Sequence, residues 1–74
     1  MNGAYALAAV ETAIDRMTKR FAASGKVLDA AIAARVLAGR HPECGLPTEE
    51  IERLVEEAAE KNKAVLLAGR HPPR

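Results

Sequence analysis

The sequence predicts a small all-α protein, a three-helix bundle or helical hairpin that self-associates through amphipathic helices. The chain has 74 residues, enough for one domain, and 49% of them are hydrophobic, which is too apolar for a disordered chain. Its larger apolar residues recur at spacings of three and four, the pattern of one helix face. We therefore expect one domain over residues 1–74, with helices at about 2–23, 26–38 and 48–68 and a flexible tail at 69–74.

The first predicted helix has a single narrow apolar stripe and a basic C-terminal end. Asp15 and Lys19 are spaced to form an ion pair along the helix. Ser24 and Gly25 interrupt the pattern, and glycine is favoured just past a helix end. The stripe consists of Leu7, Val10, Ile14, Met17 and Phe21.

The second predicted helix is short, rich in alanine and almost uncharged. Leu28, Ile32 and Val36 line one side, and alanines occupy most of the rest. A helix that is apolar on most sides must be covered on most sides. We therefore expect it to be the central helix of the bundle.

The third predicted helix begins near Thr48, which is a good N-cap residue. The glutamates that follow Thr48 suit the positive end of a helix dipole. Asn62 continues the apolar stripe of this helix. Residues 64–68 are also compatible with a short strand, but no partner strand is evident in the sequence, so we predict helix there. The expected ion pairs are Glu49 with Arg53 and Glu57 with Lys61.

A hexapeptide occurs twice, at residues 37–42 and 67–72, with the sequence Leu-Ala-Gly-Arg-His-Pro. Glycine, a basic residue and proline are all common where a helix ends. We interpret both copies as helix stop signals. A pair of Arg-His turns that bind an anion or an acidic partner is the alternative.

A shortage of bulky side chains predicts self-association. Many of the hydrophobic residues are alanine, which buries little area, and Cys44 is the only cysteine, so no disulfide stabilises the chain. We expect a homo-oligomer, with a dimer favoured. The expected interface consists of the first stripe and one side of the second helix, namely Leu7, Val10, Ile14, Met17, Phe21, Leu28, Ile32 and Val36.

The composition also excludes some classes of function. The formal net charge is +1, which gives no global attraction to nucleic acid, and no stretch is long and apolar enough to cross a bilayer. The N-terminus lacks the basic region of a secretory signal, so we expect a cytoplasmic protein. The three candidate metal ligands, His41, Cys44 and His71, are too few for a structural zinc site, so we expect neither metal nor cofactor.

The predicted function is a non-catalytic protein-binding adaptor, regulator or assembly subunit, because the helices have surplus apolar surface and no catalytic motif. A small DNA- or RNA-binding regulator is the main alternative. The long connection between the second and third helices and the glutamates of the third helix disfavour it, because phosphates repel carboxylates. An accessory subunit of an enzyme, or a metal-binding protein, is a further alternative. The basic residues available to contact an anion or nucleic acid are Arg16, Lys19, Arg20, Lys26, Arg40 and Arg70.

Overall fold

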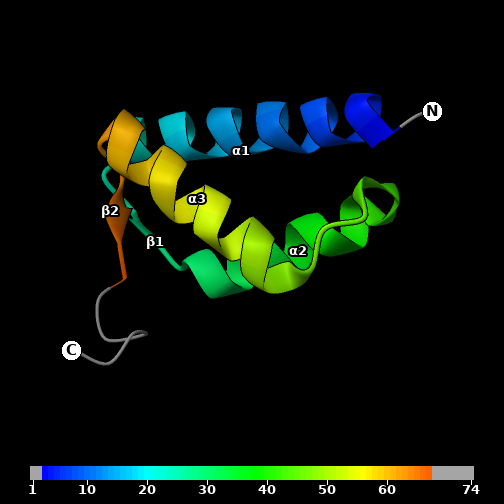
Figure 1. Cartoon of the computed structure of the whole chain (residues 1–74). Coiled ribbons are helices and arrows are strands. Elements are labelled where there is room, and N and C mark those ends of the chain that lie inside the picture. The colour runs from blue at the N-terminus through cyan, green and yellow to red at the C-terminus, as the bar shows by residue number, and fades with distance from the viewer. Residues whose placement is uncertain (1–2, 68–74) are drawn as a thin grey trace.

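The computed structural model describes residues 3–67 and confirms the all-α prediction (Figure 1). The three helices are α1 (Gly3–Ser24), α2 (Ala30–Arg40) and α3 (Thr48–Asn62). A 3₁₀ turn, η1 (Pro42–Cys44), connects α2 to α3, and two short strands, β1 (Val27–Leu28) and β2 (Val65–Leu66), follow α1 and α3. The tail predicted at 69–74 lies outside the described residues.

Helix α1 spans the molecule. At a rise of about 1.5 Å per residue its 22 residues measure about 33 Å, close to the longest extent of the protein, 37 Å. It ends where the sequence predicts, because Gly25 adopts a left-handed conformation with φ of 73°. The Gly25 N–H donates to the carbonyl of Phe21 at 2.9 Å, and the Ser24 hydroxyl donates to the same carbonyl at 3.1 Å.

The second helix begins later than predicted, and the reason is Asp29. Its carboxylate Oδ1 accepts hydrogen bonds from the N–H groups of Ala31 at 3.0 Å and Ile32 at 3.2 Å, the geometry of an N-cap. Residues 27 and 28, which were predicted to be helical, form β1 instead. At the other end α2 continues through Gly39 to Arg40, and His41 caps it.

The third helix ends earlier than predicted, so the assignment of residues 64–68 to helix is wrong for the described part, 64–67. Lys63 takes the left-handed conformation with φ of 64°, and the Ala64 N–H donates to the carbonyl of Ala59 at 2.8 Å. The chain then extends into β2. The N-cap also differs, because Pro47 occupies that position and Thr48 is the first helical residue.

The partner strand that was not evident in the sequence is β1. It pairs with β2 in parallel, with Val27 opposite Val65 and Leu28 opposite Leu66, and the Leu67 N–H donates to the carbonyl of Leu28 at 2.9 Å. Parallel strands need a long connection, which α2, η1 and α3 supply. The sheet thereby ties the end of α3 to the start of α2.

The repeated hexapeptide has different structural roles in its two copies. The first copy does end a helix, although at His41 and without a left-handed Gly39. The second copy begins at Leu67, directly after β2 and five residues beyond the end of α3. Its interpretation as a helix stop signal is therefore wrong, and its residues 68–72 lie outside the described part.

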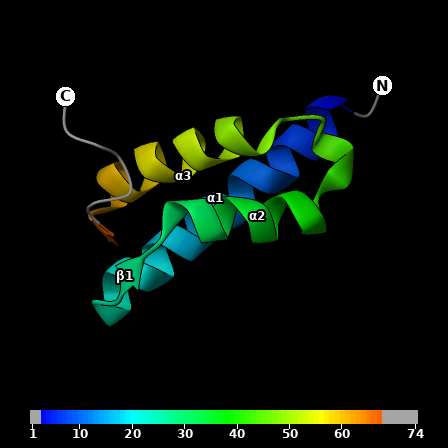
Figure 2. The same cartoon turned by 90° about the horizontal axis from the view of Figure 1, so that it is seen from below.

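The bridging helix is α3, which corrects the prediction that the second helix is central. Helix α3 packs along both α1 and α2, whereas α1 and α2 make little direct contact with each other. The N-terminal part of α1 lies beside η1 and its C-terminal end beside β1 (Figures 1 and 2). Within residues 3–67, helix α2 is covered on one face. The buried apolar residues are Ala6, Val10, Ile14, Leu28, Ala30, Ala31, Ala33, Ala34, Leu37, Ile51, Val55 and Ala59.

The surface ion pairs agree in part with the prediction. Lys19 and Asp15 pair at 3.1 Å, as expected. Arg53 contacts Glu50 and Glu57, so the predicted pair of Arg53 with Glu49 is replaced, and Glu57 turns toward Arg53 instead of Lys61. These side chains are well exposed, and each such pair contributes little to stability.

The bridging role of α3 predicts that Ile51→Ala is strongly destabilising. Ile51 is 0% exposed, and truncation of a buried isoleucine leaves a cavity that costs about 2–5 kcal/mol. Ile32→Ala is the matched control, because Ile32 is 55% exposed and its truncation should change stability by less than about 1 kcal/mol. Urea denaturation followed by circular dichroism measures both. Equal losses for the two variants would contradict this assignment of the core.

Candidate functional site

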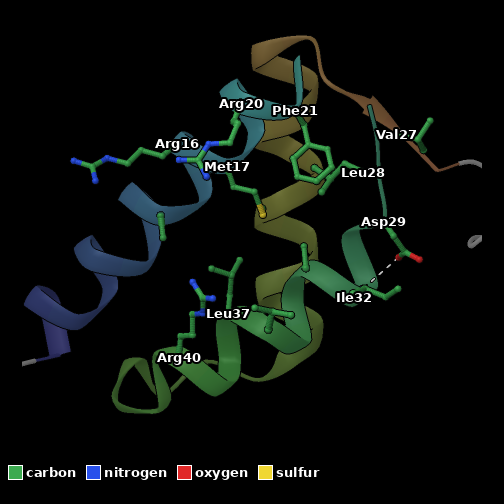
Figure 3. Close-up of a pocket in the computed structure, with 13 residues that line it drawn as sticks. Arg16, Met17, Arg20, Phe21, Val27, Leu28, Asp29, Ile32, Leu37 and Arg40 are labelled. Atoms are coloured by element: carbon green, nitrogen blue, oxygen red, sulfur yellow. Dashed lines mark hydrogen bonds between the residues drawn. The ribbon is translucent and has the colours of Figure 1, made fainter. Parts of the chain in front are cut away.

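A groove lies between α1 and α2 and follows from the way the helices pack. Helix α3 packs along both helices, whereas the backbones of α1 and α2 come close at few points, so their facing sides are not tightly packed. The resulting cavity has a volume of about 580 Å³ and is lined by residues of α1, β1 and α2 (Figure 3). We call it the α1–α2 groove.

The walls of the α1–α2 groove are mainly apolar. Met17 and Phe21 of α1 are half-buried in it, and Leu28 and Leu37 lie beneath them at 2% and 6% exposure. The close-up shows the Phe21 ring beside Leu28 (Figure 3). On the α2 side of the groove, two branched apolar side chains are open to solvent: Ile32 is 55% exposed and Val36 is 48% exposed. The groove therefore offers apolar surface that the described chain does not cover.

Three arginines flank this apolar surface. Arg16 and Arg20 project from α1 and Arg40 from the end of α2, and all three are exposed (Figure 3). None of them forms an ion pair with any residue of the range 3–67, whereas Arg53 on α3 contacts two glutamates. Among the described lining residues the acidic one is Asp29, whose carboxylate caps α2. The rim of the groove is therefore cationic.

The structure divides the eight residues predicted to form an interface. Val10, Ile14 and Leu28 are at most 3% exposed and belong to the chain's own core, which corrects the expectation that they face a second subunit. The α1 stripe contributes to two different surfaces. Its members Val10 and Ile14 face the core, and Met17 and Phe21 line the groove.

The other predicted interface residues remain near the surface. Leu7 is half-buried against the core, and Ile32 and Val36 line the groove. With Met17, Phe21 and the buried Leu28, five of the eight predicted residues thus meet in one place. Their contact with a second copy of the chain stays a prediction.

The six basic residues predicted to contact anions are also divided. Arg16, Arg20 and Arg40 gather at the groove, although Arg40 is distant in sequence from the other two. Lys19 pairs with Asp15, and Lys26 is exposed between α1 and β1. Arg70 lies outside the described residues.

The candidate metal ligands do not form a cluster in the described part of the chain. His41 caps α2 and Cys44 ends η1, where the Cys44 N–H donates to the carbonyl of His41 at 3.1 Å. Cys44 is half-buried against the core. No group of three or more His, Cys, Asp or Glu side chains suited to a metal ion occurs within residues 3–67, and His71 lies beyond them.

A polar cluster, which the sequence did not reveal, joins α1 to α3. Thr18 is completely buried, and its hydroxyl donates to the carbonyls of Ile14 at 2.9 Å and Asp15 at 3.0 Å. The Asn62 amide donates to the Thr18 hydroxyl at 2.8 Å and to the Asp15 carboxylate at 3.1 Å. The sequence feature that could have indicated this cluster is Asn62, which is in register with the apolar stripe of its helix. An asparagine at such a position needs a polar partner when it packs.

The same cluster changes the acidity of Asp15. The hydrogen bond from Asn62, followed by that from Lys19, stabilises the carboxylate and lowers the pKa of Asp15 below its ordinary value. The cluster holds the C-terminal half of α1 against α3, and this half supplies the α1 side of the groove. It positions the groove without lining it.

Together the fold and the groove define a small helical protein with an open, arginine-flanked apolar surface. No family model, curated protein or solved structure matches the chain. Within the described residues no helix is sufficiently long and apolar to cross a membrane.

Removal of the Asn62 amide tests the polar cluster. Asn62→Ala should lower the free energy of unfolding at pH 7 by about 1–2 kcal/mol, because the buried Thr18 hydroxyl and the Asp15 carboxylate each lose a donor. A carboxylate whose pKa is lowered by folding contributes stability above its unfolded pKa, about 4, and that contribution disappears as the pH falls through the folded value. The gap between wild type and Asn62→Ala should therefore shrink below pH about 4.

Urea denaturation at pH 7 and at low pH measures this gap. Glu60→Ala, an exposed change on the same helix, is the control and should stay within about 0.5 kcal/mol of wild type at pH 7. A gap that is unchanged or widens in acid would show that Asn62 does not act on the Asp15 carboxylate.

Proposed function

We propose that this protein is a small non-catalytic protein–protein interaction module and that the α1–α2 groove is its binding surface. The observation that carries the proposal is the combination of exposed Ile32 and Val36 with the half-buried Met17 and Phe21 in one groove. Apolar surface removed from water contributes about 25 cal/mol per Å². A partner that covers this groove therefore gains free energy that folding of the single chain leaves unused.

Grooves between two helices commonly bind another helix. An amphipathic helix places its apolar face in such a groove and its charged face toward solvent. The α1–α2 groove is open along α2, where Ile32 and Val36 are one helical turn apart. This open geometry suits an extended macromolecular partner.

The nucleic-acid alternative has less support. In its favour, Arg16, Arg20 and Arg40 gather on one surface. Against it, the surface between these arginines consists of apolar side chains, which cannot donate hydrogen bonds to phosphates. The first turn of α3 also carries Glu49 and Glu50. For the role of enzyme accessory or metal-binding protein, the described residues provide no specific supporting contact.

We also propose that the protein forms a homodimer, and we place its interface on the small sheet. Half of the buried apolar residues in the described part of the chain are alanine, so the core is modest. Val27, which also lines one end of the α1–α2 groove, lies opposite Val65 in the sheet. The two valines are 54% and 53% exposed, and the adjacent Leu67 is 44% exposed. These uncharged side chains suit packing against their own copies about a twofold axis.

Affinity capture tests the interaction module. Wild-type protein, Val36→Glu and the matched control Ala9→Glu serve as baits in an extract of the cells that encode the chain. Ala9 is exposed on α1 and does not line the groove. We expect the same partner on wild type and Ala9→Glu and its loss from Val36→Glu, because a carboxylate in an apolar interface costs several-fold to a hundredfold in affinity.

The capture experiment has a clear contrary result. If no protein distinguishes the Val36→Glu bait from the other two, the groove is not a protein-binding surface. Circular dichroism of the three baits confirms equal helix content, since all the substituted positions are exposed.

Sedimentation equilibrium over a concentration series tests the homodimer. We expect the wild type and Val36→Glu to dimerise at micromolar concentration and Val65→Glu to remain monomeric, because the substitution places a charge opposite its own copy. A monomeric wild type at these concentrations would contradict the homodimer, and loss of the dimer in Val36→Glu alone would place it at the groove.

A further inference from the structure

We propose that the occupant of the α1–α2 groove is an acidic amphipathic helix of another protein. This inference rests on the proposed function and specifies the chemistry of the partner. Its support is the charge of the groove. Arg16, Arg20 and Arg40 surround an apolar surface and have no ion-pair partner between residues 3 and 67.

The arginines select for carboxylates. The guanidinium group binds a carboxylate through two parallel hydrogen bonds, and its aliphatic stem packs on apolar surface. A helix with leucines at positions i, i+4 and i+7 and glutamates beside them would place its leucines on Met17 and Phe21 and its carboxylates at the rim (Figure 3). The 11 residues of α2 span about 16 Å, so about three to four turns of a partner helix match the groove.

A second copy of the chain fits the groove poorly. Two grooves packed face to face would bring three arginines of each copy together, and the acidic lining residue of the described chain, Asp29, already caps α2. Helix α3 is the acidic helix of the chain, but its large apolar side chains Ile51 and Val55 are completely buried. Leu54 of α3 is half-buried against the core, and the exposed large apolar residues of the described chain lie on other elements. Helix α3 of a second copy therefore has little apolar surface to insert.

The C-terminal residues of the same chain also lack the required chemistry. Residues 68–74 contain two arginines and no acidic residue. Their charge has the same sign as the rim of the groove. Residues 68–74 therefore do not supply the acidic partner.

A designed peptide tests the inference directly. The probe is a fluorescent peptide of about 14 residues with leucines at i, i+4, i+7 and i+11 and glutamate at most other positions. One comparison peptide keeps the leucines and replaces glutamate by lysine, and a second scrambles the first so that the leucines no longer share a face. Fluorescence anisotropy measures binding of all three to wild-type protein.

We expect the glutamate peptide alone to bind, and to bind more weakly at high salt because the rim arginines are exposed. Arg20→Glu and Arg40→Glu should each weaken binding about tenfold, and Val36→Glu should abolish it. Arg35→Glu is the matched control. Arg35 is exposed on α2 outside the groove lining, and its reversal should change affinity about twofold or less.

Each contrary outcome overturns the inference in a recognisable way. Equal binding of the lysine or scrambled peptide would remove the role of charge or of the helical stripe. Binding of a short DNA duplex that Arg20→Glu abolishes and Val36→Glu leaves intact would assign the arginines to nucleic acid. A dimer that Val36→Glu dissociates would assign the groove to a second copy.

The affinity capture separates this inference from the proposed function. If the glutamate peptide fails to bind while Val36→Glu still loses its captured partner, the groove binds a protein of different chemistry. If neither experiment distinguishes Val36→Glu from the wild type, the proposed function fails together with the inference.

Discussion

The packing of α3 against both other helices is the interaction on which the rest of the structure depends. Ile51, Val55 and Ala59 recur every four residues and are completely buried. Helices α1 and α2 make little contact of their own, so their relative position is set through α3 and by the short sheet that ties the end of α3 to the start of α2. The groove is a direct result of this arrangement, since two helices held by a third leave their own facing sides open.

The fold also separates charges that the overall composition hides. A net charge of +1 suggests an electrically neutral surface, yet α3 carries most of the glutamates, while exposed arginines project from α1 and α2. Arg53 balances part of the acidic face through Glu50 and Glu57. The arginines of the groove have no such acidic ion-pair partner within the described residues, so the cationic rim is available to a binding partner. Charge of this kind affects association rate and specificity more than it affects folding.

The sequence predicted those features that depend on neighbouring residues. The end of α1 at Gly25 and the pair of Asp15 with Lys19 follow from local conformation and helix spacing. The pairing of β1 with β2 was not predictable, because Val27 and Val65 are far apart in sequence and two-residue strands carry almost no periodic signal. The groove required the same long-range information. Its arginines and apolar residues were identified separately, and only the packing on α3 brings Arg40 to the surface that contains Arg16.

The residues on the open side of α2 argue for a role in binding. An exposed position in a helix is most stable with alanine or a long polar residue, and β-branched residues have lower helix propensity. Ile32 and Val36 are both β-branched, are about half exposed and contribute little to the core, so folding stability does not account for them. A partner that buries them does account for them, because their stiff side chains lose little rotamer freedom on contact and offer apolar area. Since half of the buried apolar residues between positions 6 and 67 are alanine, binding at this groove would also raise the apparent stability of a chain with a modest core.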